Sequence, residues 1–310
     1  MTTDAPKPIF LAGPTAVGKS AVALLLAERV AGEIISVDSM QVYRGLDIGT
    51  AKPTRAERDR IPHHLLDVAA MNESFDAAQF CRLAKVAVSE IQARGKVPVF
   101  CGGTGFYFKA FLDGLGEAPA ADPELRRELE AIPLPELLAE LGRRDPQTLA
   151  KIDQNNPRRV LRAVEVIRLT GKPFSEQRAD WQAGKEKPSA LRSFGLMREK
   201  TDLLKRITER VDDMFRSGLV AETKQLIPFG LEQNQTAVQA IGYRQVLEHI
   251  RGEHSLPETI ELVKIRTRQF SKRQLTWFRR QMQLDWIELE ADSGAEQATD
   301  RICELLCRRA

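Results

Sequence analysis

The chain has 310 residues, of which 43% are hydrophobic and 29% charged, the composition of an ordinary soluble globular protein. Its 46 Lys and Arg against 43 Asp and Glu give a net charge of +3, too small to indicate nucleic-acid binding by itself. The N-terminus lacks a basic-then-apolar leader pattern, and no apolar run approaches the roughly 20 residues of a membrane span. We therefore expect a cytoplasmic protein that does not enter a membrane.

The cysteines and histidines do not form a metal-binding pattern. The four cysteines contain no CxxC pair, and no histidine lies at metal-ligand spacing from them. Cys303 and Cys307 are one helical turn apart, but without a neighbouring histidine we interpret them as residues of a helix face.

The first hundred residues alternate between strand and helix patterns. Apolar runs predict strands at Ile9–Ala12, Glu33–Val37 and Val97–Cys101. Between them, periodic patterns predict a helix from Lys19 to about Val30 and another from a cap at Ser74 to about Ala93. Strands separated by helices at this spacing indicate a parallel sheet with crossover helices.

The pattern changes after about Gly116. Prolines interrupt short helical segments, and strand signals nearly vanish. Asp122-Pro123 and Asn156-Pro157 each resemble a helix N-cap followed by proline in the first turn. Long amphipathic helices follow from Asp202 onward. We expect an α/β fold with a P-loop NTPase-like parallel sheet flanked by helices, formed by residues 1–118 and 190–310. A mainly helical insertion is expected at 119–189.

The segment after the first predicted strand matches G-x-x-x-x-G-K-[ST] completely. It consists of Gly13, Pro14, Thr15, Ala16, Val17, Gly18, Lys19 and Ser20. Such a phosphate loop (P-loop) wraps its N–H groups and the helix N-terminus around a di- or triphosphate, while the lysine adds a positive charge. The hydroxyl of Ser20 can bind Mg²⁺, which usually keeps several waters. The sequence therefore predicts phosphate binding.

The P-loop leaves the reaction open. A small-molecule kinase or a nucleic-acid-stimulated NTPase would have the same motif. Asp38, which follows the second predicted strand, could support Mg²⁺, act as a general base, or cap the next element.

Five further segments, in order along the chain, distinguish these alternatives. They are Asp38–Pro53, Pro62–Asp67, Gly102–Tyr107, Gly242–Gln245 and Lys272–Arg279. Together with the P-loop, they closely resemble the tRNA dimethylallyltransferases, also called isopentenyltransferases. The resemblance extends over nearly the whole chain.

That resemblance implies transfer of a dimethylallyl group from dimethylallyl diphosphate to the exocyclic N6 amine of the adenine adjacent to the anticodon, releasing diphosphate. It implies that Lys19 and the loop amides hold the diphosphate, and that Ser20 holds Mg²⁺. Thr15 would lie near the bridging oxygen of the leaving group, and Asp38 would accept the proton of the attacking amine.

The resemblance also implies that the insertion at 119–189 binds tRNA, and it implies which residues of the chain contact the tRNA. The target base must leave the stack to react. The residues implied to contact tRNA are Asp38, Ser39, Met40, Gln41, Thr104, Arg126, Arg158, Arg159, Val160, Leu161, Arg162, Gln239, Ala240, Ile241, Gly242, Tyr243, Arg244, Lys272, Arg273, Gln274, Leu275, Thr276, Trp277, Phe278 and Arg279. From sequence alone, a solvated charge on a short helix is the favoured explanation of Arg126.

Two basic stretches agree with a tRNA partner. Leu262–Arg280 contains seven cations and no acid, interleaved with aromatic residues. Arg158–Arg162 would line one helix face above apolar Leu161, Val164 and Ile167. A kinase would leave the C-terminal basic helix without a role, and an NTPase would need a clear Walker-B acidic pair. No long apolar surface helix is present, so we expect a monomer.

Overall fold

The computed structural model describes residues 5–177, 192–290 and 294–308. The chain divides into two compact units: a core unit, Met1–Phe111 with Ala183–Ala310, and an insertion unit, Leu112–Gln182. The insertion unit begins before Pro119, the first proline after the change in sequence pattern. Residues 112–118 belong to the insertion unit because they are bonded to it: the backbone N–H of Glu117 donates to the carbonyl oxygen of Gln177 at 2.9 Å.

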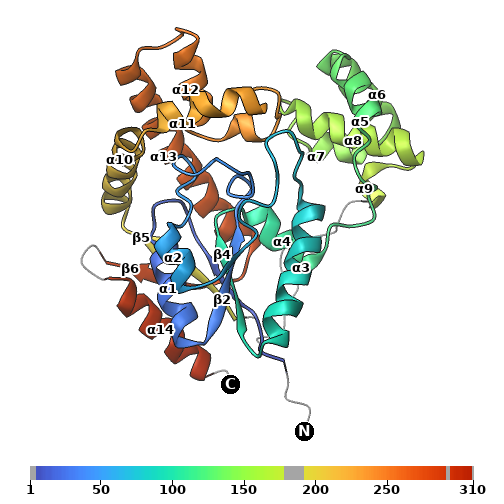
Figure 1. Ribbon diagram of the computed structural model, residues 1–310. Helices are drawn as coiled ribbons and strands as arrows, with labels where there is room; N and C mark the ends of the chain where they lie inside the picture. The colour runs from blue at the N-terminus through green and yellow to red at the C-terminus, as the bar shows by residue number, and fades with distance from the viewer. Residues whose placement is uncertain (1–4, 178–191, 291–293, 309–310) are drawn as a thin grey trace. The chain divides into compact units, whose positions relative to one another are not determined.

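The described part of the core unit contains one six-stranded, all-parallel sheet, in the order β3-β2-β4-β1-β5-β6 (Figure 1). The strands are β1 (Ile9–Ala12), β2 (Gly32–Val37), β3 (His63–His64), β4 (Val97–Gly102), β5 (Arg192–Arg198) and β6 (Asp285–Leu289). The three predicted strands are confirmed as β1, β2 and β4. Two strands that were not predicted, β5 and β6, lie where strand signals nearly vanish in the sequence and complete one side of the sheet.

Helices surround this sheet. In the core unit they are α1 (Lys19–Arg29), α2 (Arg55–Arg60), α3 (Ala77–Ala93), α4 (Gly105–Asp113), α10 (Lys200–Arg216), α11 (Leu219–Leu226), α12 (Tyr243–Ile250), α13 (Leu256–Gln281) and α14 (Ala295–Cys307). Two short 3₁₀ helices, η1 (Ile227–Phe229) and η2 (Ala237–Gln239), lie among them. The predicted cap at Ser74 is wrong: Asp76 caps α3 in a reciprocal pair of hydrogen bonds with Gln79.

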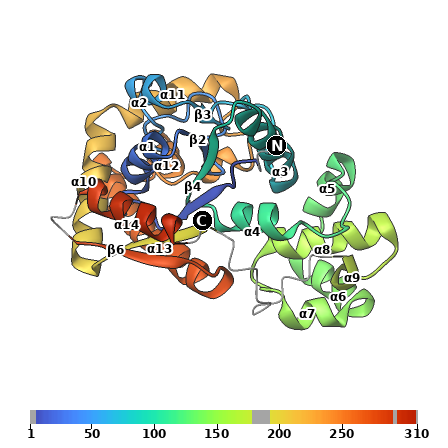
Figure 2. The same cartoon turned by 90° about the horizontal axis from the view of Figure 1, so that it is seen from below.

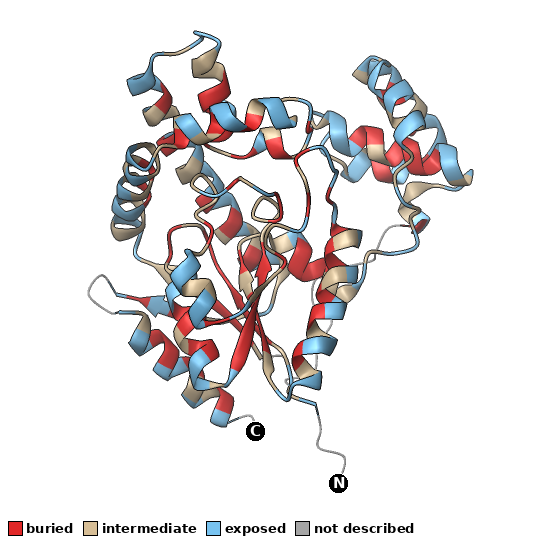
Figure 3. Ribbon diagram, viewed as in Figure 1, coloured by how far each residue is buried: buried red, intermediate tan, exposed pale blue. Residues whose placement is uncertain are grey.

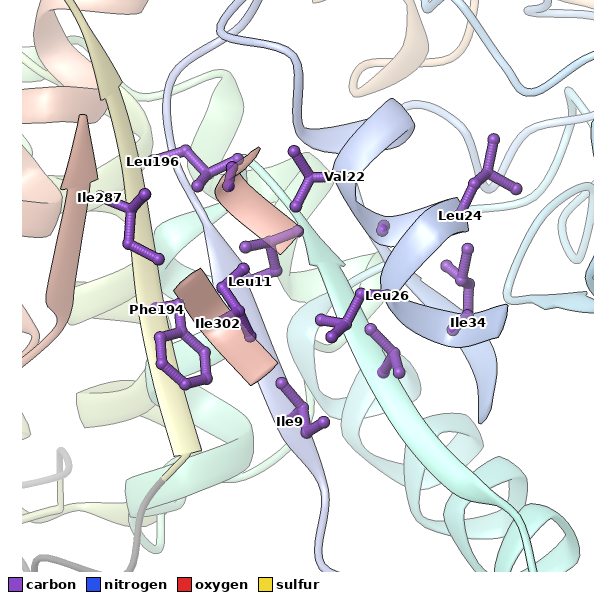
Figure 4. Close-up of a cluster of buried hydrophobic side chains, with 14 of the residues drawn as sticks. Ile9, Leu11, Val22, Leu24, Leu26, Ile34, Phe194, Leu196, Ile287 and Ile302 are labelled. Carbon is purple, nitrogen blue, oxygen red and sulfur yellow. The ribbon is translucent and has the colours of Figure 1, made fainter. Parts of the chain in front are cut away.

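Alternate residues of β1 face opposite sides of the sheet. On one side, Ile9 and Leu11 pack with α1 and α14, where Leu26 and Ile302 are fully buried (Figure 4). Figures 1 and 2 show α1 and α14 on this side and α3 on the other. Burial of each such side chain contributes about 1.5–3 kcal/mol, so this layer anchors the strand that leads into the P-loop.

The opposite side of the sheet is aromatic. Phe10 of β1 stacks on Phe100 of β4 with ring centroids 4.8 Å apart, and Phe111 of α4 lies 4.7 Å from Phe100. Phe108 of α4 meets Phe278 of α13 edge to face. This layer links helix α13 to the strands that carry the site.

The insertion unit is helical in its described residues. It contains α5 (Pro123–Glu130), α6 (Leu134–Arg144), α7 (Pro146–Lys151), α8 (Pro157–Thr170) and α9 (Phe174–Gln177). Asp122 and Asn156 cap α5 and α8 with their side chains, so both predicted caps are confirmed. Its core packs Leu129, Leu137 and Leu141 against α8, half of whose residues are buried (Figure 3).

Among the described residues, no helix is both long and apolar enough to cross a membrane.

Candidate active site

Three chain segments meet at the carboxyl edge of the sheet because β1, β2 and β4 are parallel neighbours. The P-loop follows β1, Asp38 follows β2, and Gly103-Thr104 follows β4. They line a cavity of about 370 Å³ that includes Thr15, Lys19, Ser20 and the whole segment Asp38–Gln41. The structure thus brings together the predicted phosphate-binding and base-binding residues.

The P-loop opens α1 without a capping side chain from the described residues, since its N-cap is Gly18 in the left-handed region, with φ of 109°. The first-turn N–H groups of α1 therefore have no side-chain oxygen over them, as a phosphate-binding helix end requires. The ammonium group of Lys19 donates to the carbonyl oxygen of Pro14 at 2.7 Å, folded back along the loop.

Burial lowers the pKa of Lys19 from an ordinary value of 10.5 to about 8. The positive charge of Arg210 acts in the same direction, and the carboxylate of Asp38 opposes it. An anionic ligand in the cavity would favour the charged form of Lys19. A bound phosphate would therefore keep Lys19 protonated at pH values above about 8.

Asp38 does cap the turn that follows β2, one of the three roles that the sequence left open. Its Oδ1 accepts hydrogen bonds from the backbone N–H groups of Met40 at 2.8 Å and Gln41 at 3.2 Å. Within the described residues, its Oδ2 has no hydrogen-bond donor. Capping therefore orients the carboxylate while one oxygen remains available to accept a proton.

The neighbouring polar side chains hold this turn in place. Thr104 accepts a hydrogen bond from the N–H of Ser39 at 3.1 Å through its hydroxyl oxygen. The amide of Gln41 donates to the carbonyl oxygens of Thr50 and Ala51 at 3.1 and 3.3 Å, and its oxygen accepts from the hydroxyl of Ser36. The side chain of Gln41 thus stabilises the cavity wall through these hydrogen bonds, and it also lines the cavity.

The loop that contains Gly49 forms part of the cavity wall, and side chains of α11 and α12 hold it in place. The hydroxyl of Tyr243 accepts from the N–H of Gly49 at 3.0 Å and donates to Glu222, whose carboxylate also accepts from the N–H of Ile48. A Cβ on Gly49 would lie 2.4 Å from the ring of Tyr243, so only glycine fits there. Burial, with the Glu222 charge, raises the pKa of Tyr243 and keeps the phenol protonated.

Three arginines at this site were missed by the sequence analysis. Arg210 of α10 lines the cavity, while Arg206 and Arg198 donate their Nε–H groups to the P-loop carbonyls of Ala16 at 3.0 Å and Val17 at 2.8 Å. Arg206 and Arg210 are four residues apart on an expected amphipathic helix, so they had to share one face. That spacing was the available signal, but nothing in the sequence showed that this face meets the P-loop.

The predicted tRNA-binding residues near the C-terminus lie around the cavity and next to it. Gln239, Ala240, Ile241, Arg273 and Gln274 line the cavity itself. A second cavity, of about 430 Å³, shares Gln239, Ile241 and Arg273 with the first and adds Arg244. Arg244, Arg266 and Arg273 line this second cavity together with Glu248 and Glu253, and Arg244 pairs with Glu248 at 3.1 Å.

In addition to Ala240 and Gln274, which line the cavity, four side chains for which contact with RNA was predicted are buried. Val160, Leu161, Tyr243 and Phe278 are at most 9% exposed. They pack in the cores of their units, so in this conformation only neighbouring residues can present side chains to a nucleic acid. Leu275 and Trp277 are half-buried, and Lys272 and Thr276 are exposed. Trp277 packs so closely on Gly105 that a Cβ there would lie 2.1 Å from its ring.

Ion pairs use some of the predicted basic residues. Lys264 pairs with Asp212 of α10 at 2.8 Å, so the stretch 262–280 is acid-free in sequence but not in space. In the insertion unit, Arg126 and Arg162 both bind the buried carboxylate of Glu165, at 2.6 and 2.7 Å. Arg158 and Arg159 are exposed on α8. Part of the cationic surface therefore has a structural role.

The oxygen donors of the cavity fit a hard divalent cation. The hydroxyl of Ser20 and the carboxylate of Asp38 both line it. Across the described residues, no cluster of three or more His, Cys, Asp or Glu side chains could hold a metal unaided. The hydroxyl of Ser20, completed by ligand phosphate and water, matches the coordination that Mg²⁺ adopts with phosphorylated substrates, so the carboxylate of Asp38 is not required as a ligand.

The parallel sheet, the complete P-loop and the cavity at the carboxyl edge define a P-loop α/β protein with a site for a phosphorylated ligand. Residues 41–281 match the family described as IPP transferase. The chain is 45% identical to tRNA dimethylallyltransferase 1 of Trichlorobacter lovleyi over 293 residues, covering 93% of this chain and 96% of the relative. The protein belongs to the IPP transferase family.

Solved structures are similar over the full length. The full-length tRNA isopentenylpyrophosphate transferase of Bacillus halodurans is 39% identical with a TM-score of 0.72, covering 99% of this chain and 97% of that one. A eukaryotic dimethylallyltransferase acting on tRNA is 28% identical with a TM-score of 0.76, covering 99% and 81%.

Proposed function

We propose that this protein transfers the dimethylallyl group of dimethylallyl diphosphate to the N6 amine of the adenine adjacent to the anticodon in tRNA. The amine nitrogen attacks the first prenyl carbon, the carbon–oxygen bond breaks, and diphosphate leaves. One observation carries the proposal: a single cavity holds both the P-loop side chains and Asp38. The names of the relatives agree with this reaction.

The P-loop side would bind the donor. Lys19 and the first-turn amides of α1 suit the diphosphate oxygens, and the hydroxyl of Thr15 suits the oxygen that gains negative charge as the bond breaks. The guanidinium group of Arg210 lines the same cavity and would help to neutralise the leaving diphosphate. Mg²⁺, held by Ser20 and diphosphate oxygens, would supply further charge neutralisation.

The adenine side would be formed by the turn after β2. Asp38 would accept the proton that the amine loses, and its capped Oδ1 would keep the carboxylate oriented during the reaction. Apolar side chains of Val211, Met214 and Val263 also line the cavity and suit the five-carbon prenyl chain. A paired or stacked adenine cannot enter this cavity, so the base would be extruded first.

The basic surfaces would bind the RNA backbone. Exposed cations lie on α13, at Lys272 and Arg273, and on α8, at Arg158 and Arg159. The aromatic rings of Phe270 and Trp277 accompany the cations of α13 and suit stacking on unpaired bases. We further propose that the protein acts in the cytoplasm, where its tRNA substrate would be met. Residues of one chain complete the cavity, so a monomer would suffice.

A transfer assay tests the proposed function. The protein is incubated with Mg²⁺ and either ATP or dimethylallyl diphosphate, with and without unmodified tRNA. We expect a mass gain on the tRNA equal to one dimethylallyl group, only when the prenyl donor and tRNA are both present. Phosphorylation of a small molecule, or RNA-stimulated ATP hydrolysis without any mass gain on the RNA, would replace this proposal with one of the two alternatives.

A further inference from the structure

One buried side chain of α13 connects the two halves of the cavity. The Oε1 atom of Gln274 accepts a hydrogen bond from the backbone N–H of Thr15 at 2.9 Å. Its Nε2 atom donates to the carbonyl oxygen of Gly103, also at 2.9 Å. Gln274 is 8% exposed, so water competes little for either bond.

The chemistry of the two partners fixes the orientation of the amide. A backbone N–H can only donate and a carbonyl oxygen can only accept, so the oxygen of Gln274 must face Thr15 and its nitrogen must face Gly103. A carboxylate would offer no donor to Gly103, and an apolar side chain of equal length would satisfy neither group. Both bonds therefore require an amide on a side chain of this length.

The two hydrogen bonds of Gln274, to Thr15 and Gly103, are called the clamp below. Further hydrogen bonds extend from it to the side of the cavity proposed for the adenine. The N–H of Thr104, next to Gly103, donates to the carbonyl oxygen of Val37 at 3.1 Å. The hydroxyl oxygen of Thr104 accepts from the N–H of Ser39 at 3.1 Å. Ser39 follows Asp38 directly. A series of hydrogen bonds, connected by the peptide bond between Gly103 and Thr104, thus runs from Thr15 to Ser39. Thr15 is on the side proposed for the prenyl diphosphate, and Ser39 is next to Asp38, on the side proposed for the adenine.

We propose that Gln274 is a positioning residue that fixes the distance between the donor diphosphate and the acceptor amine. The role depends on the proposed function, and it differs from direct contact with RNA, because both polar atoms of the side chain already have partners within the protein. A displacement of about 1 Å between reacting groups can slow a reaction by about 100-fold. Binding of either substrate alone does not depend on that distance.

The packing around Gly103 supplies an independent way to break the clamp. A Cβ at Gly103 would lie 2.3 Å from Nε2 of Gln274, so alanine there must push the amide away. Gly103 does not have a positive φ, and its backbone can therefore accept alanine. Gly103→Ala should reproduce the effect of changing Gln274 without altering residue 274.

The test compares Gln274→Met, Gly103→Ala and the double variant in single-turnover transfer at saturating donor and tRNA. We expect each single variant to be about 30-fold slower, with both dissociation constants within about threefold of the wild type. The double variant should also be about 30-fold slower and not about 900-fold, because both changes break the same clamp. Exchange of the Thr15 amide hydrogen should be faster in all three.

Gln225→Met is the matched control, since Gln225 is an exposed helical glutamine of α11 outside the cavity. Its transfer rate should equal that of the wild type. An unchanged rate in Gln274→Met, or multiplicative effects in the double variant, would overturn the positioning role while leaving the proposed function intact. Absence of any transfer by the wild type would overturn the proposed function, and this role with it.

Discussion

The Nε atom of Arg206 lies 3.0 Å from the carbonyl oxygen of Ala16, an alanine whose φ is 64°. The left-handed region costs a non-glycine residue roughly 1–2 kcal/mol, so this conformation needs support from its surroundings. Arg198 supports the next carbonyl, that of Val17. The conformation of the P-loop therefore depends on two arginines distant in sequence.

Replacement of Arg206 by methionine should weaken donor binding about tenfold. A hydrogen bond from a charged group contributes about 1.5–3 kcal/mol, and its loss lets Ala16 leave the conformation that aligns the loop amides. Donor titration by calorimetry measures the effect, and tRNA affinity should not change. Lys205→Met, at the exposed neighbouring position, is the control. If Arg206→Met binds donor normally, the loop holds its conformation without α10.

Donor affinity should fall as the pH rises above about 8. Burial places the pKa of Lys19 near 8, so its ammonium group loses its proton there and its attraction to the diphosphate disappears. The same lowered pKa means that the unfolded chain binds more protons between about pH 8 and 10.5, so the free protein gains stability from this group across that range. Donor titrations from pH 7 to 9.5 measure the effect.

Lys19→Arg provides the matched control for that profile. A guanidinium group stays protonated throughout the range, so the variant should bind donor more weakly at pH 7 but with little dependence on pH. A wild-type profile as flat as that of Lys19→Arg would show that Lys19 keeps its charge.

Asp38→Asn should slow the chemical step by roughly 10²–10⁴-fold while leaving Mg²⁺-dependent donor affinity almost unchanged. Asparagine keeps the size and the oxygen that caps Met40 and Gln41, but it loses the basicity. Single-turnover transfer at saturating substrates measures the rate, and donor is titrated separately against Mg²⁺. Joint loss of Mg²⁺ and donor affinity would instead assign Asp38 to metal support, and a normal rate would rule out the general base.

Replacement of Arg159 and replacement of Arg162, both on α8, should differ in their effects on tRNA binding and on stability. Arg159 is exposed, so Arg159→Ala should reduce the slope of log affinity for tRNA against log salt by about one without changing thermal stability. Arg162 binds the buried Glu165, so Arg162→Ala should destabilise the protein as well. Salt titrations and thermal unfolding separate these effects. Arg168→Ala, which removes an ion pair of α8 with the less buried Glu140, controls for the loss of an ion pair that does not involve Glu165.

Lys52→Met should destabilise the core unit by about 3 kcal/mol, since its buried ammonium group binds Asp67, Asp47 and the carbonyl oxygen of Tyr43. Burial alone would raise the pKa of Asp67, but hydrogen bonds from Lys52 and Arg58 hold this pKa below its usual value.

The difference between wild type and Lys52→Met in urea unfolding should therefore begin to shrink below about pH 4, the ordinary pKa of an aspartate, and disappear as the pH falls through the lower pKa of folded Asp67. Lys85→Met, at an exposed position of α3, should change stability by less than about 0.5 kcal/mol. Equal stability of Lys52→Met and wild type would mean that the apolar side chain replaces the ion pairs fully.

Local patterns in the sequence were sufficient for much of the fold. The strands β1, β2 and β4 are short apolar runs that end in turn residues, and their bounds agree with the structure to within one residue. The caps at Asp122 and Asn156 were likewise predictable, because capping depends on a few adjacent residues. β5 and β6 were not, because Gly195 interrupts the first and the second has five residues with two acids.

The sequence by itself identified the P-loop that we propose to bind the donor diphosphate, because a P-loop is a contiguous motif whose backbone and lysine act together. It also placed Asp38 at the end of a strand, which in a parallel sheet is the side where ligands bind. Only the tertiary structure decided that Arg198, Arg206 and Gln274 hold the P-loop. Their partners are more than 180 residues away, and no spacing along the chain records which helix face will meet which loop.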